Sequence, residues 1–276
     1  MLQIGTHQEM LLDRLTDIGG VLLSEDGEEV LIPGKFLPED IYPGDRLTVF
    51  LYKDHQQRPI ATTLHPTITL GDIACLRVKQ TSEVGAFMDW GIEKDLLVPF
   101  REQKGRMREG EEHLVIMYLD ERTNRLAASA FLERFLRNDD LDLETNEEVD
   151  LIIWEETDLG YNVIVNNLYK GLVYRSDIYQ PLSTGDRMRG YVKQVRPDQK
   201  LDITLQRPGY AHVEPNARKI LEMLRSGQGF LPFTDKSAPE DIADQFQMSK
   251  KTFKKALGAL YRQRLVRLED DGVYLV

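Results

Sequence analysis

A pattern built around glycine recurs three times in this 276-residue chain, and it constrains the fold more than any other feature. Each copy opens with a glycine after a polar or acidic stretch, and a second glycine followed by an acid lies further along. The aligned positions of the three copies are Gly19, Gly85 and Gly160; Pro33, Pro99 and Tyr174; Gly44, Gly110 and Gly185; Asp45, Glu111 and Asp186; Ile60, Leu126 and Leu201; Thr63, Ser129 and Thr204. Six positions that keep register without a gap are hard to attribute to chance. The chain is therefore expected to be a tandem repeat.

Each copy carries the signals of short strands and lacks a long amphipathic helix. Segments rich in β-branched and aromatic residues, bounded by turn residues, occur at 47–52, 114–119 and 189–195. Units with four or five such strands are typical of small closed barrels, because closure leaves no edge strand exposed. We therefore expect three tandem five-stranded Greek-key barrels, at residues 1–66, 67–132 and 149–208.

Residues 133–148 separate the second and third copies and account for the longer interval between them. The segment holds seven acids and only two bases, and Phe131, Leu132, Phe135 and Leu136 at its start have helical spacing. We interpret it as a short helix followed by an acidic linker. A solvated spacer is the plain interpretation, and a functional acidic tail is the alternative.

The pattern changes at about Pro215, where helical periodicity replaces strand signals. Three helices are expected, at 217–225 after an Asn216 cap, at 239–246, and at 250–264 after a Ser249 cap. The apolar stripe of the third comprises Phe253, Ala256, Leu257, Leu260 and Tyr261. Two strands around an Asp-Gly turn close the chain. This order is typical of a winged helix-turn-helix, which we place at residues 215–276.

The overall charge of −11 hides a marked difference between the parts of the chain. Residues 1–66 hold 5 bases and 11 acids, residues 67–132 hold 9 and 11, and residues 149–208 hold 8 of each. Residues 215–276 hold 11 bases and 8 acids, and 250–264 contain six bases and no acid. The acidity therefore lies in the first copy and the linker, and a basic helix occupies the position of a recognition helix.

The catalytic inventory is poor. The five histidines are scattered over different elements without metal-ligand spacing, and the single cysteine, Cys75, excludes a disulfide framework or a zinc site built on cysteines. Neither a nucleophile with a base nor a phosphate-binding glycine loop is visible. We expect no enzyme activity, no cofactor and no metal. Without a signal-peptide pattern or an apolar run of membrane length, we expect a cytoplasmic protein without membrane contact.

Aromatic side chains interleaved with bases are the features that point to a ligand. In the strand that begins at Gly85, alternation places Phe87 and Asp89 on one face and Met88 and Trp90 on the other. With Met88 in the core, Phe87 projects outward as a stacking platform for a nucleobase. The alternative is that Phe87 packs in a seam between domains. Arg122 and Arg125, at the following hairpin, complete the candidate set of the second copy.

Two further candidate sets lie towards the C-terminus. The third copy offers two rings, Tyr169 and Tyr174, near the bases Lys193, Arg196 and Lys200, a combination that suits single-stranded RNA. Such charged hairpin tips are also ordinary solvated surface. The basic helix adds Lys250, Lys251, Lys254, Lys255, Arg262 and Arg264.

The middle copy resembles the RNA-binding repeat of the large small-subunit ribosomal protein, the S1 domain. The resemblance is carried by Gly71-Asp-Ile, Val84-Gly-Ala-Phe-Met-Asp-Trp-Gly91, Gly110-Glu, Asp120 and Arg125-Leu-Ala-Ala-Ser129, with Gly171-Leu-Val-Tyr174-Arg-Ser-Asp177 matching a further segment in the third copy. Over nearly its full length the chain resembles the conserved virulence factor B family of bacteria. The resemblance implies three tandem S1-like OB-fold β-barrels followed by a C-terminal winged helix-turn-helix, mainly β with α.

The resemblance also implies an RNA-binding regulatory protein without catalytic activity. The family's stacking phenylalanine carries over to Phe87, whereas Val21 and Asn162 stand in its place in the outer copies. Of the residues at the family's histidine position, only Tyr174 has an aromatic ring. We expect the first copy to be structural or to face a protein partner.

Three hypotheses for function follow. The leading one is binding of single-stranded RNA through the barrels and the basic helix, with an effect on gene expression after transcription. The second is a transcription regulator that binds duplex DNA through the winged helix. The third is an adaptor that docks on the ribosome or a nuclease, with ribosome-associated proteins as partners.

Overall fold

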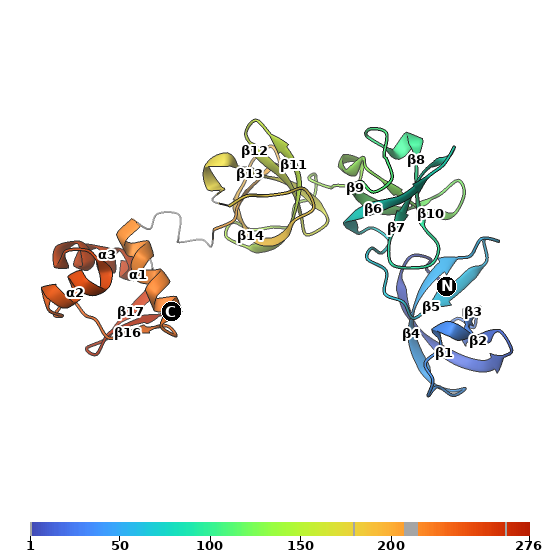
Figure 1. Ribbon diagram of the computed structural model, residues 1–276, viewed down its shortest axis with the longest axis horizontal. Coiled ribbons are helices and arrows are strands. Elements are labelled where there is room, and N and C mark those ends of the chain that lie inside the picture. The colour runs from blue at the N-terminus through green and yellow to red at the C-terminus, as the bar shows by residue number, and fades with distance from the viewer. Residues whose placement is uncertain (1, 179, 207–214, 263) are drawn as a thin grey trace. The chain divides into compact units, whose positions relative to one another are not determined.

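In a computed structural model of the chain, residues 2–178, 180–206, 215–262 and 264–276 are described. The architecture is mainly β, with three α-helices among the described residues, and these helices come after the strands of the barrels in chain order (Figure 1). The chain divides into two compact units: 1–142 with 149–189 and 196–201, and 143–148 with 190–195 and 202–276. The expected class, barrels followed by a winged helix, is confirmed.

The first barrel is closed. Its strands are β1 (His7–Thr16), β2 (Gly19–Leu23), β3 (Glu29–Pro33), β4 (Arg46–Lys53) and β5 (Pro59–Thr62). They pair in the order β1-β2-β3-β5-β4, and the parallel pair of β3 with β5, at Leu31 and Ile60, closes the ring. Ile32 of β3 and Val49 and Leu51 of β4 lie in a core with Leu12 and Leu22.

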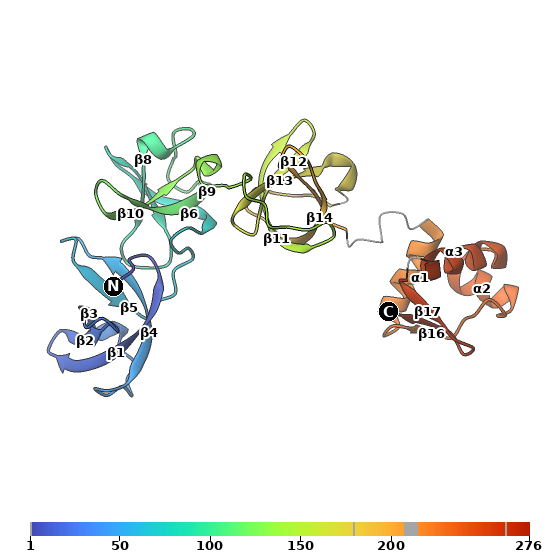
Figure 2. The same ribbon diagram turned by 180° about the vertical axis from the view of Figure 1, so that it is seen from behind.

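The third barrel repeats this order. Its strands are β11 (Glu148–Thr157), β12 (Gly160–Val165), β13 (Tyr169–Tyr174), β14 (Arg187–Val195) and β15 (Leu201–Thr204), visible from both sides in Figure 1 and Figure 2. They form a closed barrel in the order β11-β12-β13-β15-β14. The boundary that we placed at residue 208 lies outside the described residues.

The recurring first glycine is explained by the close approach of two strands. At Gly19, a Cβ would lie 2.0 Å from the carbonyl oxygen of Ile32 on the next strand. The matching distances are 2.2 Å at Gly85 and 2.0 Å at Gly160, and all three glycines have positive φ. A side chain at this position would collide with the backbone of the neighbouring strand, so only glycine fits. The repeat in the sequence therefore marks a repeated steric requirement.

The second barrel differs from its neighbours at one seam. Its strands are β6 (Ile73–Thr81), β7 (Gly85–Asp89), β8 (Leu96–Pro99), β9 (Glu112–Asp120) and β10 (Arg125–Ser129). They form a five-stranded sheet in the order β10-β9-β6-β7-β8, in which β8 and β10 lie close together without forming a ladder. Three closed barrels were expected, and this one lacks the ladder that completes the ring in the other two. In the first barrel the same junction is a single residue pair, and β8 and β10 lie as close together as β3 and β5 do.

The linker contradicts the predicted short helix. The helical structure within residues 133–148, all of them described, is limited to the end of one 3-10 turn, at Leu132–Arg134. The chain then follows the third barrel: the N–H of Arg137 donates to Leu168 O at 2.8 Å, and Asn138 Nδ2 donates to Lys170 O at 2.8 Å. These bonds hold the linker against the barrel. Phe135 and Leu136 pack against an apolar cluster that includes Ile73 and Trp154, so this part of the linker is not a bare spacer.

The C-terminal part folds as expected for a winged helix. Its elements are α1 (Pro215–Ser226), α2 (Pro239–Phe246), α3 (Lys250–Arg262) and a sheet in the order β16 (Phe230–Leu231), β18 (Val273–Leu275), β17 (Val266–Leu268). The bounds of α2 are those predicted, and the turn into α3 passes through Gln247 in the left-handed conformation. The helix α1 begins at Pro215, a residue suited to a first turn, so Asn216 is not its cap.

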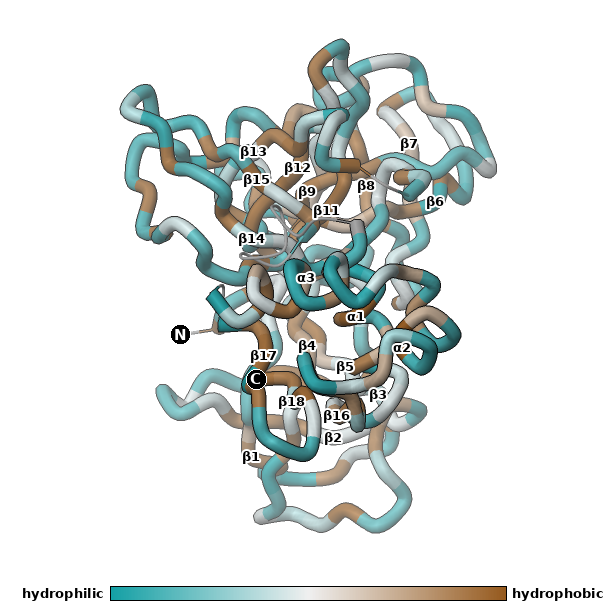
Figure 3. The backbone as a smooth tube through the Cα atoms, turned by 90° about the vertical axis from the view of Figure 1, so that its left-hand side faces the viewer, coloured by the Kyte–Doolittle hydropathy of each residue, from teal (hydrophilic) through white to brown (hydrophobic). Residues whose placement is uncertain are grey.

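The faces of α3 follow its periodicity. Phe253, Ala256, Leu257 and Leu260 are buried in the winged-helix core. Tyr261 was expected in the same stripe but is 57% exposed. It lies at the edge of the buried face of α3, next to Leu260, and its side chain is turned towards solvent. Figure 3 shows the hydrophilic stretches of α3 in teal. None of the described helices is long and apolar enough to cross a membrane.

Candidate nucleic-acid interface

A cavity of about 650 Å³ lies beside Phe87, and we call it the Phe87 cavity. Its walls include residues from both strands that meet without a ladder, Leu96 and Leu97 from β8 and Leu126 and Ala127 from β10. The junction of these two strands therefore lies in the cavity wall. An aromatic ring in such a hollow can be reached by an unstacked base.

The ring of Phe87 lies on the expected face of β7. Burial alternates along the strand, with Ala86 and Met88 buried, Phe87 half-buried and Asp89 exposed. Trp90, which we expected in the core, is 2% exposed. Asp89 does not line the cavity, and its Oδ1 accepts a hydrogen bond from Gly91 N at 3.1 Å. The structure therefore separates the two candidates that the sequence placed on one face.

A second ring in the wall was missed by the sequence reasoning. Phe100 is 49% exposed, lines the cavity and begins the 3-10 turn that follows β8, at Phe100–Glu102. A signal was present: Phe100 directly follows Pro99, one of the six repeated positions. Together with Phe87 it gives the cavity two accessible aromatic faces.

Basic side chains outnumber acidic ones in the cavity wall. Five bases, Lys53, Lys94, Arg101, Arg122 and Arg125, line it against two acids, Asp95 and Asp120. Both acids are already engaged: Asp95 pairs with Lys79 at 2.9 Å and Asp120 with Arg101 at 2.7 Å. The local balance favours an anionic ligand although the chain as a whole is acidic.

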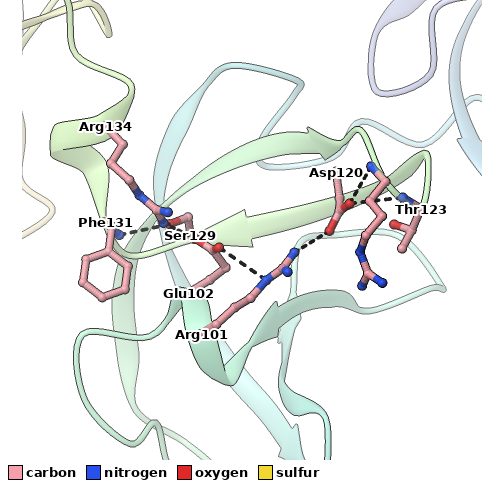
Figure 4. A network of polar contacts seen from close by, with 8 residues as sticks. Arg101, Glu102, Asp120, Thr123, Ser129, Phe131 and Arg134 are labelled. Carbon is pink, nitrogen blue, oxygen red and sulfur yellow. Dashed lines mark hydrogen bonds and ion pairs between the residues drawn. The ribbon is translucent and has the colours of Figure 1, made fainter.

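Asp120 organises the cationic side of the cavity (Figure 4). Its Oδ1 accepts hydrogen bonds from Arg122 N at 3.0 Å and Thr123 N at 3.1 Å, and its Oδ2 accepts one from Arg101 Nη2 at 2.7 Å. Hydrogen bonds from Thr123 N and from Arg122 N, with the charges of Arg101 and Arg122, hold the pKa of Asp120 below its usual range despite some desolvation. One carboxylate thus shapes the β9–β10 turn and orients a guanidinium.

Behind this turn a second carboxylate is buried. Glu102 is 6% exposed and pairs with Arg134, whose Nη2 also donates to Ser129 Oγ at 3.0 Å (Figure 4). The guanidinium of Arg134 lies 5.0 Å from the ring centre of Phe131. A buried charge requires such partners, and here they tie the 3-10 turn that carries Phe100 and Arg101 to the end of β10. This network supports the cavity without lining it.

The candidates of the third barrel are only partly brought together. Arg196 donates to the hydroxyl of Tyr174, and its guanidinium lies 5.9 Å from that ring's centre. Tyr169 is buried, at 9% exposed, because it occupies an inward position of β13, so its ring is not open to a base. Lys200 pairs with Asp198 at 2.7 Å, and Lys193 is exposed on β14.

The basic helix presents most of its charges to solvent. Lys251, Lys254, Lys255 and Arg262 are exposed on α3, and Lys250 is half-buried. Lys254 pairs with Asp235 at 3.0 Å. Arg264 follows the end of α3 and has positive φ, so it is not part of the helical face on which we placed it.

Metal and thiol chemistry find no support in the part of the chain that the structure describes. No group of three or more His, Cys, Asp or Glu residues there could hold a metal ion. Burial raises the pKa of the Cys75 thiol, which disfavours its reactive thiolate form.

Two domain families match the chain at opposite ends. Residues 218–275 match the CvfB-like winged helix domain. Residues 4–64 match the S1 domain. The S1 match thus falls on the first barrel, whereas the motifs that we singled out lie mainly in the second. Both are domain types that bind nucleic acids, so the domain content of the chain points to nucleic-acid binding.

The predicted resemblance to conserved virulence factor B is confirmed by relatives that match most of the chain. Uncharacterized protein YitL of Bacillus subtilis (strain 168) is 29% identical over 98% of this chain and 93% of its own. Conserved virulence factor B of Staphylococcus aureus is 25% identical over 92% of this chain and 88% of its own, and that of Staphylococcus epidermidis is 26% identical over 92% and 89%. A solved structure of a multidomain protein with nucleic acid binding domains from Streptococcus pneumoniae is 24% identical, covers 99% of this chain and 98% of its own, and superposes with a TM-score of 0.44.

Proposed function

We propose that this protein binds single-stranded RNA at the Phe87 cavity and acts on gene expression after transcription. The observation that carries the proposal is the combination, in one hollow of an S1-like barrel, of an accessible Phe87 ring with the guanidinium group of Arg101, which Asp120 holds in place. Stacking needs an unpaired base, whose face a duplex hides, and the guanidinium groups suit phosphates. The absence of a catalytic set in the sequence favours regulation by binding over turnover.

The basic surface of α3 supports the same proposal by a second mechanism. Its exposed lysines and arginine suit contacts to phosphates, which add affinity without reading sequence. RNA bound by the barrel would gain non-specific affinity from this helix, and such affinity falls as salt rises.

The test is a fluorescence-anisotropy titration of the full-length protein. The probes are a labelled U-rich RNA of about 16 nucleotides, the upper end of an OB-fold site size, a mixed-sequence RNA, and the matching single-stranded and duplex DNA. We expect binding of the single-stranded RNAs at micromolar protein and low salt, and weaker binding of the duplex. If neither RNA binds under these conditions, the proposed function is wrong.

Duplex DNA is the second candidate, favoured by the position of α3 after a short turn, where a recognition helix sits. Against it, α3 contains neither Asn nor Gln, the side chains that pair with adenine edges. The same titration decides between the two candidates, because a preference for the duplex that is lost on substitution of the α3 bases would favour DNA.

A further inference from the structure

We infer that the first barrel, through the turn between β4 and β5, forms a second arm of the Phe87 cavity and contacts a nucleobase with Gln57. This inference deepens the proposed function and rests on it. The sequence indicated the opposite for the first barrel, which lacks a stacking ring at Val21 and carries most of the acids. The structure nevertheless places Tyr52, Lys53, His55 and Gln57 in the cavity wall.

Two lysine side chains, one from each barrel, attach the turn to the second barrel by hydrogen bonds. Lys94, from the second barrel, donates to the carbonyl oxygens of Lys53 at 2.7 Å and Asp54 at 2.9 Å. In the reverse direction, Lys53 Nζ donates to Asn124 O, in the β9–β10 turn, at 2.6 Å. Burial removes part of the water around the ammonium group of Lys94 and lowers its pKa. Lysine side chains bound to main-chain carbonyl oxygens thus join the β4–β5 turn to the second barrel.

An apolar seam supports these polar contacts. Phe50, Tyr52 and Ile68 are buried in the same cluster as Trp90 and Met88 of the second barrel. The rings of Phe50 and Trp90 meet edge to face with centroids 5.7 Å apart. Since Trp90 lies in the cavity wall as well as in this seam, the wall and the junction of the two barrels are one packed structure.

Gln57 is the residue of this arm with an unsatisfied hydrogen-bonding group. Its Oε1 is covered by protein rather than open to the cavity, and among the residues that the structure describes it meets no hydrogen-bond donor. A turn of the side-chain amide that brings this oxygen into the cavity would therefore break no hydrogen bond of the oxygen. The turn holds Gln57 in the left-handed conformation, at φ 65°, because Asp54 Oδ1 accepts Gln56 N at 2.8 Å and Arg58 N at 2.9 Å. A buried acceptor without a donor is unfavourable, and the preorganised turn keeps it in the wall of the cavity.

The side-chain amide of Gln57 suits a base edge better than a phosphate. Its oxygen accepts and its nitrogen donates, so it can pair with a base edge that carries an N–H beside a carbonyl, whereas a phosphate offers acceptors to the nitrogen alone. None of the first-barrel residues in the wall is acidic, and Asp54, beside them, is paired with Arg58 at 2.8 Å. An unpaired base that stacks in the cavity would therefore find a hydrogen-bond acceptor on the first barrel and cations on the second.

The test substitutes Gln57→Met in the full-length protein, with Gln56→Met as the matched control. Methionine keeps the length of the side chain and removes its hydrogen-bonding groups. Gln56 is exposed in the same turn and does not line the cavity. In anisotropy titrations with the labelled U-rich RNA, Gln57→Met should bind about threefold to tenfold more weakly, the equivalent of one neutral hydrogen bond. The control should bind with the affinity of the unaltered protein. The midpoint temperature of thermal unfolding of Gln57→Met should not be lower than that of the control.

A second measurement does not depend on the folding of any variant. RNA that carries 4-thiouridine is crosslinked to the unaltered protein, and the modified peptides are mapped by mass spectrometry. We expect crosslinks within residues 52–58 in addition to those near Phe87. Crosslinks near Phe87 alone, or Gln57→Met binding as tightly as the control while Phe87→Ala does not, would overturn this inference and leave the proposed function standing. No RNA binding by the unaltered protein would remove both.

Discussion

The Phe87 cavity and the helix α3 are two cationic surfaces built on different principles. In the cavity, Asp120 holds Arg101, and the basic side chains lie in the same wall as the accessible rings of Phe87 and Phe100. On α3, the exposed lysines are long, flexible side chains. One of them, Lys254, forms an ion pair with Asp235 at 3.0 Å. The cavity therefore suits a ligand whose base and phosphate have one particular arrangement, whereas α3 suits phosphates in any arrangement.

This difference predicts different responses to salt. Binding by stacking and hydrogen bonds changes little with ionic strength, whereas phosphate contacts release counterions and weaken as salt rises. Substitutions in the cavity should therefore lower affinity at every salt concentration, and substitutions on α3 should mainly change the slope. The following predictions test that contrast.

The largest effect is expected for Phe87→Ala. Loss of one stacking platform should weaken binding of single-stranded RNA about tenfold to a hundredfold, with an unchanged salt slope. The measurement is anisotropy at two salt concentrations. Tyr42→Ala is the control, because Tyr42 is an exposed ring of the first barrel that does not line the cavity. Equal affinities of the two variants would contradict a stacking role for Phe87.

Asp120→Ala should weaken binding although it removes a negative charge. The β9–β10 turn loses the acceptor for two of its N–H groups, and Arg101 loses the carboxylate that orients it. Without Asp120, the turn and Arg101 would have to become ordered when RNA binds. The free energy of that ordering predicts an affinity about threefold to tenfold lower. In the control Glu121→Ala the same charge is lost from an exposed neighbour, and binding should stay equal or tighten slightly. If both variants bind more tightly, Asp120 does not position the cations.

Neutralising Lys251 and Arg262 together should act mainly on the salt dependence. For single strands each lost phosphate contact lowers the slope by about 0.7, so the pair should reduce it by at most about 1.4. The affinity loss should shrink as salt rises, unlike that of Phe87→Ala. The control neutralises two winged-helix bases outside α3, Lys219 and Lys236. A control with the same change of slope would mean that net charge, rather than the face of α3, is responsible.

The smallest effect concerns acid stability. The folded-state pKa of Asp120 lies below its ordinary value of 3.8, so its ionised form stabilises the folded chain above that value. This contribution is lost as the pH falls from 3.8 through the lower folded-state pKa, because the unfolded chain then binds the proton more readily. Denaturation midpoints measured over this range should fall more steeply for the unaltered protein than for Asp120→Ala. Parallel curves would show that the carboxylate contributes nothing there.

The sequence predicted the elements whose causes are local. Residues 239–246 form a helix with the predicted bounds, and alternation along β7 placed Met88 inside and Phe87 outside. Two rings were placed wrongly on their own elements: Tyr169 is buried at an inward position of β13, and Tyr261 is exposed at the edge of α3. The linker was placed wrongly because another segment sets its path, since Leu168 and Lys170 accept its hydrogen bonds.

The sequence by itself determined the three repeats, the winged helix and the identity of the stacking candidate, because each depends on spacing along the chain. Only the tertiary structure decided that β8 and β10 meet without a ladder, and that the first barrel contributes to the wall beside Phe87. Lys53 and Asn124 are 71 positions apart, and no periodic pattern records a contact between two turns. Turn residues meet through the packing of whole barrels, so the environment of Gln57 is a property of the fold rather than of its local sequence.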